Sequence, residues 1–410
     1  MNHRAVFFLL PTTAGLIPMW RGYSLRTLLF MIAGPLLMDL SNVVVGAWMN
    51  ISTVHQDIAP RTQMWIGTLG PASFCVGAIL ADRLHTPRTA LRNMTLILPV
   101  AAGLGIAPLY YQELWFFIVM SVAIGLMASQ YFLGFQFALG HVRPFRFVAW
   151  SVAFYNIAWG SGFSIGSFLG IWAVTWNRNV TIAYILAINA LHLVIILAAR
   201  SAGVRHDDDH QIVHQIDSTP SHRRAAWVCG FVTSFVVVGT TSVLWLHYGE
   251  AIGLDAYQIA LGSFLMLAPI PILTPVWAHF RMKVTRPGLM IATLPVQAAA
   301  LIAVRAIPGD RWPLQLIPLC VIGASASMVY FQSIYYANAD EQNTTRSVSV
   351  NEAILVVGCM VGPLVFGLAA WDDRVSYRPY IIGAALVIVA TATASAIWHQ
   401  RGRGTATQPR

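Results

Sequence analysis

The stretch Thr27–Met49, TLLFMIAGPLLMDLSNVVVGAWM, is an apolar run interrupted by one acidic residue, Asp39. About 20 apolar residues are enough to cross the hydrocarbon core of a bilayer as an α-helix. A helix satisfies its own backbone hydrogen bonds, so it is the default spanning element. A charged side chain at mid-depth costs at least about 2.5–3.5 kcal/mol. We therefore expect a membrane protein in which Asp39 pairs with something or lies beside something that passes it.

The composition supports the same interpretation. Of the 410 residues, 57% are hydrophobic and 10% are charged, whereas a soluble domain is typically about 25% charged. This deficit excludes a water-soluble domain. The formal net charge of +9 does not indicate a nucleic-acid partner, because we expect the basic residues to be distributed unequally across a lipid bilayer.

Runs of this kind recur along the chain, and we predict an all-α integral membrane protein with twelve spans. The predicted spans are 27–49, 64–84, 94–111, 114–139, 147–174, 179–199, 226–248, 258–280, 288–306, 312–338, 348–370 and 378–399. They form an amino-terminal bundle over 27–199 and a carboxy-terminal bundle over 226–399. A polar linker over 200–225 separates these two halves.

The distribution of basic residues predicts the orientation. With the amino terminus inside, 19 of the 25 Lys and Arg residues fall on the cytoplasmic side, as the positive-inside rule requires. We thus expect a multi-pass protein of the plasma (inner) membrane, with a cytoplasmic or interfacial amino terminus over 1–26 and a cytoplasmic tail over 400–410. Residues 5–19 are also apolar, but Pro11 and Pro18 interrupt them. An interfacial segment and an extra membrane segment both remain open there.

Three linker histidines could form a metal site. His206, His210 and His214 are spaced i, i+4, i+8, which would align them on a helix and could bind a divalent metal. The alternative is a solvated linker, which we favour because nothing in the sequence fixes this segment as a helix. The four cysteines show no zinc or disulfide spacing. We expect neither a bound metal nor a cofactor.

Glycine and serine patterns repeat between the halves. In span four, Ile124-Gly125, Ala128-Ser129 and Tyr131-Phe132 correspond to Ile322-Gly323, Ala326-Ser327 and Tyr330-Phe331 in span ten. Small residues four apart also mark spans five and eleven, where they allow close helix packing. These helix-packing residues are Gly162, Gly166, Gly170, Gly358, Gly362 and Pro363. The recurrence predicts duplicated bundles with a site between them.

The loop after span two, Ala78–Arg88 or AILADRLHTPR, resembles the G-x-L-a-D-R-x-G-R-R signature of the major facilitator superfamily. The resemblance implies two pseudo-symmetric six-helix bundles that alternate access to a central site. Ala78 and His85 replace the two motif glycines, and Ser121 stands where the family has an arginine in span four. Span five lacks the Gly-Pro pair of drug/proton antiporters, which makes a multidrug antiporter less favoured without excluding it.

The same resemblance implies gating residues. In the family, the carboxylate of this loop faces the start of span eleven, where helix N–H groups and the positive end of the helix dipole stabilise an acid. This assigns gating roles to Asp82, Arg83 and Arg88, with Asn351 and Glu352 at the facing helix. Glu352 could instead be a second titrating group, although we favour the structural or gating role.

Asp39, with Asn42 one helical turn later, is the main candidate for coupling or binding. A carboxyl in a poorly hydrated cavity favours its protonated form, so it can exchange a proton. The alternatives are a structural Asp–Asn hydrogen bond and a direct ligand for a cationic substrate. Further candidates combine aromatic walls with hydrogen-bonding groups, as ligand pockets do. They are Gln130, Tyr155, Asn156, Trp159, Gln297, Tyr330 and Gln332. By contrast, His192 lies among apolar residues and is expected to pack.

The sequence predicts a monomeric secondary active transporter of a small neutral or weakly cationic solute, coupled to protons through Asp39. The second half offers no basic residue at mid-depth that would attract an anion. The alternatives are a multidrug/proton efflux antiporter and a non-transporting receptor or assembly protein with the same architecture. No intramembrane catalytic constellation or nucleotide-binding loop indicates an enzyme.

Overall fold

The computed structural model describes residues 25–84, 87–141, 148–201, 220–280, 286–339 and 344–369, and isolated positions between 387 and 395. The amino-terminal run 5–19, the linker histidines and nearly all of the predicted twelfth span lie outside the described residues. Side chains are not described for some residues at the ends of these ranges, including Asp82, Arg83 and Arg88.

The described chain is helical throughout. Its α-helices are α2 Leu25–His55, α3 Pro60–Leu84, α4 Pro87–Ile106, α5 Leu114–His141, α6 Val148–Trp172, α7 Arg178–Ser201, α8 Pro220–Gly239, α9 Trp245–Ala251, α10 Ala256–Leu267, α11 Pro269–His279, α13 Pro287–Ala306, α14 Trp312–Asn338 and α15 Thr344–Ala369. A π-helical turn, η4 (Thr240–Leu244), joins α8 to α9. Short 3₁₀ turns are η2 (Ala107–Leu109), η3 (Ala173–Thr175) and η5 (Gly309–Arg311).

Within the described residues, 11 helical segments are long and apolar enough to cross a membrane. Two of these segments each contain two α-helices: α8 and α9 joined by η4 form one, and α10 with α11 forms the other. The 11 segments coincide with the first eleven predicted spans, so the prediction of a helical multi-pass membrane protein is confirmed. The first helix is longer than predicted, since it continues to His55.

Proline and capping residues explain where several helices begin. Proline occupies the first position of α3, α4, α8, α11 and α13, where the missing N–H costs no helical hydrogen bond. At the start of α10, Asp255 Oδ1 accepts from Gln258 N at 2.8 Å and Asp255 N donates to Gln258 Oε1 at 3.0 Å. This capping box satisfies two amide groups that the helix leaves without partners.

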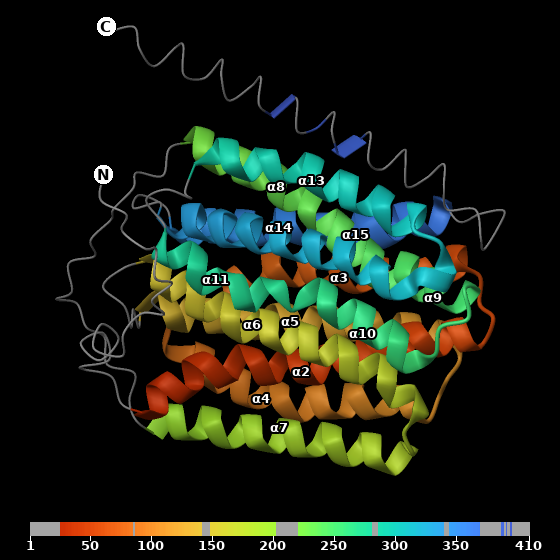
Figure 1. The fold of residues 1–410 in the computed structure, drawn as a ribbon. Coiled ribbons are helices and arrows are strands. Elements are labelled where there is room, and N and C mark those ends of the chain that lie inside the picture. The colour runs from red at the N-terminus through yellow and green to blue at the C-terminus, as the bar shows by residue number, and fades with distance from the viewer. Residues whose placement is uncertain are drawn as a thin grey trace, which may run out of the picture.

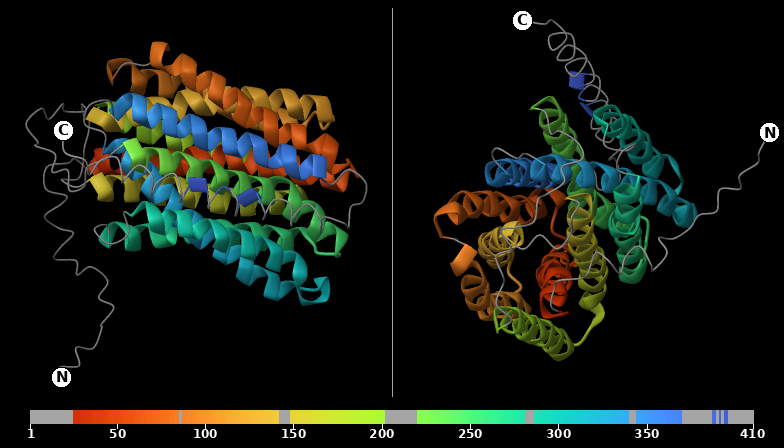
Figure 2. Two further views of the ribbon diagram at one scale, coloured as in Figure 1. Left: turned by 90° about the horizontal axis from the view of Figure 1, so that it is seen from above. Right: turned by 90° about the vertical axis from the view of Figure 1, so that its left-hand side faces the viewer.

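The helices run side by side (Figures 1 and 2). The first group consists of α2 to α7 and the second of α8 to α15, from the two halves of the chain. In the first group, α2 packs mainly on α6 and α3 on α5. In the second group, α8 packs on α15, while α10, α11 and α13 contact α14. Between the groups, α3 contacts α15, and α6 contacts α10 and α11. The contacts between the groups therefore involve spans two and five of the first half and spans eight and eleven of the second. Spans eight and eleven are the second and fifth spans of their own half.

Glycines produce the closest helix contacts. A Cβ at Gly166 of α6 would lie 3.0 Å from the Cβ of Val43, and one at Gly170 would overlap the Val44 carbonyl oxygen of α2. Likewise, a Cβ at Gly362 of α15 would overlap the carbonyl oxygen of Phe235 in α8. Both glycine stripes thus face the first helix of their own group.

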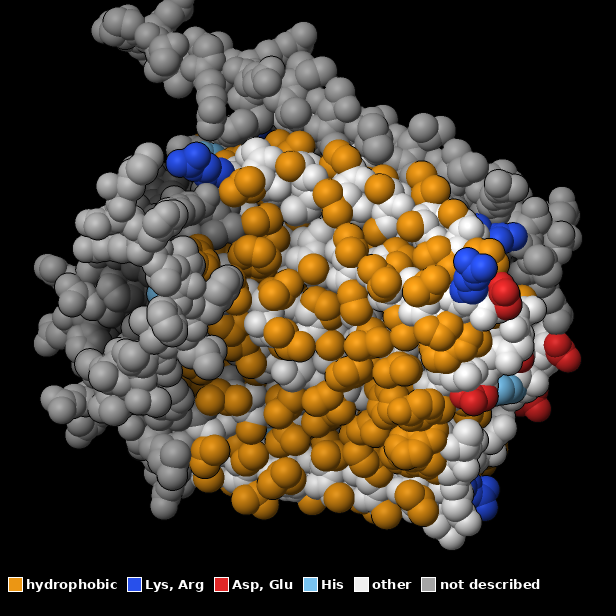
Figure 3. All heavy atoms as spheres, viewed as in Figure 1, with side chains coloured by type: hydrophobic (Ala, Val, Ile, Leu, Met, Phe, Trp, Pro, Cys, Tyr) orange, Lys and Arg blue, Asp and Glu red, His pale blue; other side chains and the backbone are white. Residues whose placement is uncertain are grey.

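The surface is apolar around the middle of the bundle. Large hydrophobic side chains are exposed there, including Ile79, Leu96, Val194 and Ile272. On the face shown in Figure 3, charged side chains lie toward the two ends of the helices, and a broad apolar zone separates them. Such a surface suits contact with lipid hydrocarbon, because exposed apolar area in water would be unfavourable.

Candidate functional site

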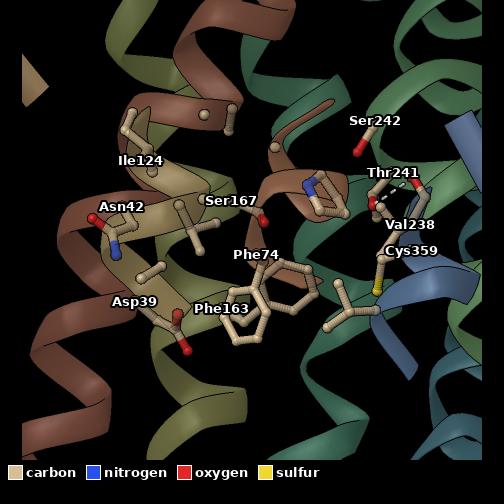
Figure 4. Close-up of a pocket in the computed structure, with 18 of the residues that line it drawn as sticks. Asp39, Asn42, Phe74, Ile124, Phe163, Ser167, Val238, Thr241, Ser242 and Cys359 are labelled. Carbon is tan, nitrogen blue, oxygen red and sulfur yellow. Dashed lines mark hydrogen bonds between the residues drawn. The ribbon is translucent and has the colours of Figure 1, made fainter. Parts of the chain in front are cut away.

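A cavity of about 340 Å³ lies between the two helix groups. Residues of α2, α3, α5 and α6 line one side, and residues of α8, η4, α9, α10, α14 and α15 line the other. In Figure 4, Asp39 and Asn42 lie on one wall, Thr241, Ser242 and Cys359 lie on the other, and Phe74 and Phe163 lie between them. The cavity is large enough for a small organic molecule.

Asp39 is the most unusual residue of this lining. Its side chain is 5% exposed, and its Oδ2 atom has no hydrogen-bond partner in the described part of the chain. Asn42, one turn further along α2, also lines the cavity, and no described residue hydrogen-bonds to its Nδ2. A buried polar atom without a partner is costly. The two side chains therefore offer an acceptor and a donor to a bound group.

Aromatic residues from both groups meet at the cavity. The ring of Trp159 in α6 stacks on Phe163 at 5.7 Å between centroids and meets Tyr330 of α14 edge-on at 5.5 Å. The Tyr330 hydroxyl lies 3.2 Å from Ser234 Oγ of α8. All four side chains line the cavity, so its aromatic wall spans the boundary between the groups.

The π-helical turn η4 also contributes to the lining. Thr241 and Ser242 line the cavity from this turn, and Thr241 Oγ1 donates to the carbonyl oxygen of Val237 at 2.9 Å. A π-helical turn shifts the register of the backbone hydrogen bonds and is frequent at functional sites. Here the Ser242 carbonyl oxygen accepts a hydrogen bond from Gln63 Nε2 of α3 at 3.2 Å.

Gln63 connects the helix groups beyond one end of the cavity, the end near His55. Its side chain is fully buried, and Nε2 also donates to the Asn50 carbonyl oxygen of α2 at 3.1 Å. Gln63 Oε1 accepts a hydrogen bond from Nε2 of His247 in α9. Asn50 and Ser242 themselves line the cavity. The Gln63 contacts therefore join the two helix groups at this end of the cavity.

The charged side chains among the described lining residues are both acidic. Asp39 from α2 and Glu352 from α15 line the cavity, and no Lys, Arg or His is among the described residues that do so. Glu352 is half-buried. The two acids belong to opposite helix groups, so both groups carry a titratable side chain at the cavity.

The cavity brings together six of the residues singled out from the sequence. Asp39, Asn42, Tyr155, Trp159, Tyr330 and Glu352 all line it.

Five other candidates do not line the cavity. Gln130 Nε2 donates to the Gly77 carbonyl oxygen at 2.7 Å, and Gln297 Nε2 donates to Thr233 Oγ1 at 3.0 Å. Asn156, Gln332 and Asn351 are buried within their bundles. The side chains of Asp82, Arg83 and Arg88, which the sequence predicts to act in gating, are not described.

Some lining residues were not singled out from the sequence, notably Phe74, Phe163, Ser234 and Cys359. Phenylalanine and serine occur throughout membrane helices, so their identity alone carries no signal for a cavity. Among the described residues, no group of three or more His, Cys, Asp or Glu side chains could hold a metal ion.

The sequence matches no family model and no curated protein sequence. Among solved structures, the fold is similar to the crystal structure of a mutant of the nucleoside transporter NupG, with a TM-score of 0.59 and 10% sequence identity. The match covers 90% of this chain and 99% of that chain. At this identity the likeness establishes a shared fold, and the fold is one that a membrane transporter uses.

Proposed function

We propose that the protein is a secondary active transporter of the major facilitator type, in which two six-helix bundles alternate access to the cavity. The observation that carries the proposal is the buried Asp39 carboxyl, facing a cavity to which both helix groups contribute. The likeness to a transporter fold supports it. A cavity between two groups can open to either membrane face when the groups tilt about it.

Proton coupling through Asp39 is part of the proposal. When the cavity is closed and dry, a carboxyl there favours the protonated form, and when water enters, the ionised form becomes cheaper. Asp39 would therefore take up and release a proton as access alternates. The buried Oδ2 supports this role, because it has no hydrogen-bond partner among the described residues that would hold the ionised state.

The remaining expectations extend this proposal. The protein works as a monomer in the plasma (inner) membrane, with both termini in the cytoplasm and a small neutral or weakly cationic solute as substrate. Asp82, Arg83 and Arg88 act at the cytoplasmic gate, with Asn351 on the facing helix. The absence of Lys, Arg and His from the described cavity lining supports the predicted solute class.

The first experiment is a thermal-stability screen of the purified protein against sugars, nucleosides, amino acids, amines and drugs at two pH values. A ligand that binds the native state raises its stability by mass action. Each hit is then tested for uptake into proteoliposomes with an imposed pH gradient. Wild-type protein should accumulate the solute, and the gradient should set the extent of accumulation.

The variant Asp39→Asn tests coupling. It should still exchange solute down a gradient, but accumulation driven by the pH gradient should be lost. Asp310→Asn is the matched control, because Asp310 is exposed and lies outside the cavity lining. Undiminished pH-driven accumulation in Asp39→Asn would refute the coupling role. Binding without any flux in wild type would favour a receptor.

A further inference from the structure

The charges that surround the cavity indicate which class of ligand it binds. Only the description of that ligand as a substrate rests on the proposed function. Asp39 and Glu352 face the same space from opposite helix groups, and the described lining holds no basic side chain. When these two carboxyls are ionised, they repel an anion. They also attract a cation, because opposite charges interact strongly where little water screens them.

The unpartnered oxygen of Asp39 points to the same ligand. The side chain is 5% exposed, its Oδ2 has no hydrogen-bond partner within the described ranges, and the carboxyl faces the cavity (Figure 4). A buried ionised carboxylate is favourable only when it is paired and hydrogen-bonded. Among the described residues, no cationic side chain lines the cavity to pair with it. An ammonium group on a ligand would supply that partner.

The aromatic wall indicates that the cation is organic. Trp159, Phe163 and Tyr330 line the cavity together, with Phe74 on the α3 side. Aromatic faces attract ammonium groups through the ring quadrupole, and they pack against the apolar body of the same ligand. A cavity of about 340 Å³ is far larger than a metal ion needs. Its volume lies at the small end of pockets for organic ligands.

We propose that the cavity binds a small organic monocation with an aromatic or aliphatic body. Asp39 pairs with the charged nitrogen, and Glu352 on the opposite wall adds to the preference for a cation over a neutral or anionic molecule. Trp159, Phe163 and Tyr330 enclose the body. Because the acids belong to different groups, both helix groups contribute to recognition of the ligand.

The test uses three probes of similar shape and different charge, measured by thermal stability and by calorimetry in nanodiscs at pH 7.4. 2-Phenylethylammonium, which carries N–H donors, is the cation, 2-phenylethanol is the neutral counterpart, and phenylacetate is the anion. The cation should bind at least about tenfold more tightly than the neutral probe, which corresponds to 1.4 kcal/mol. Phenylacetate should bind more weakly than either.

Variants then locate the source of the preference. Asp39→Asn should reduce the ratio of cation to neutral binding by about tenfold or more, and Glu352→Gln by a smaller factor, chiefly because the cation binds more weakly. Asp39→Glu keeps the charge and should retain a preference for the cation if Asp39→Asn proves unstable. Asp310→Asn, exposed and outside the lining, should behave as wild type.

Three results would overturn the inference. They are equal or tighter binding of the neutral probe, preference for the anion, and a preference for the cation that survives both Asp39→Asn and Glu352→Gln. No binding of the cation at millimolar concentration counts against it as well. Measurements of flux and of binding distinguish the two proposals. If the protein transports a neutral solute in response to a pH gradient but does not bind the cation, the transporter proposal holds and this inference is wrong. If the protein binds the cation selectively but shows no flux, this inference holds and the transporter proposal is wrong.

Discussion

Gly162 of α6 packs directly on Asp39 of α2: a Cβ placed on Gly162 would lie 2.8 Å from the Cβ of Asp39 and 2.6 Å from the carbonyl oxygen of Leu36. The helix that carries Trp159 and Phe163 thus approaches α2 closely beside the buried carboxyl. A glycine on α6 therefore contributes to the position of Asp39 in the cavity wall.

Gly162→Ala should weaken both stability and ligand binding. The added methyl group meets backbone on α2, which cannot move aside as the end of a flexible side chain can. Overpacking of this kind costs about 1–3 kcal/mol. The measurement is the thermal midpoint of the purified protein, together with its affinity for a ligand from the screen. Both should fall, because separating α6 from α2 displaces Asp39 and the aromatic wall.

Gly103→Ala is the matched control for this prediction. Gly103 lies on α4, and a Cβ added there would have no neighbouring atom within 4 Å, so the methyl group has open space. Its stability should equal or exceed that of wild type, because alanine favours a helix over glycine by about 1 kcal/mol. If the two variants lose stability equally, close approach at Gly162 is not the cause.

Tyr131 and His192 should be energetically coupled. The Tyr131 hydroxyl lies 2.6 Å from His192 Nε2, and both side chains are fully buried. Removing either partner leaves a buried polar atom unsatisfied, which costs about 1–3 kcal/mol. Tyr131→Phe and His192→Leu should each destabilise the protein, and the double variant should lose less than the sum. Interhelical hydrogen bonds in membrane proteins average about 0.6 kcal/mol in such cycles.

This double-mutant cycle also tests whether His192 has only a structural role. A coupling energy near that value with unchanged flux would make the pair a structural link between α5 and α7. Strict additivity of the two single changes would show that the hydrogen bond contributes nothing to stability. Chemical unfolding followed by tryptophan fluorescence measures all four proteins under the same conditions.

The spans were predictable because each one needs about 20 apolar residues in a row, and such a run can be recognised in a single sequence. Asp39 was predictable as a cavity residue because a charged side chain at mid-membrane depth is energetically costly when it faces lipid, so it usually faces the interior of the bundle or a cavity. The break inside the seventh span was not predictable. Nothing in Thr240–Leu244 resembles a helix breaker, yet this stretch forms the π-helical turn beside the cavity.

Most of the lining residues could not be predicted, because lipid and protein interior favour the same side chains. Leu96 is 66% exposed and Leu98 is 1% exposed on the same helix, although the two residues are chemically identical. In a soluble helix, burial would separate apolar from polar positions. In a membrane helix, that contrast is lost, so Phe163 at the cavity and a lipid-facing phenylalanine look alike in the sequence.

Gln63→Ala should open the cavity toward the end of the bundle near His55. Gln63 joins the groups through the Ser242 carbonyl oxygen and His247, and it holds Asn50 of α2 as well. Loss of these buried hydrogen bonds should raise the population open at this end about tenfold, which corresponds to 1.4 kcal/mol. Cys359 lines the cavity, so its reaction with a membrane-impermeant thiol reagent reports the opening.

The measurement uses a background in which Cys75, Cys229 and Cys320 are replaced by alanine, in intact cells and in inside-out vesicles. The labelling rate should rise in only one preparation, the one that presents the His55 end to the reagent. His55→Ala is the control. The His55–Glu250 pair spans 3.9 Å at the same end, but its side chains are 45% and 40% exposed. Because exposed pairs contribute only about 0–1 kcal/mol, His55→Ala should change the rate far less. Equal rates in Gln63→Ala and wild type would mean that the buried glutamine does not hold this end closed.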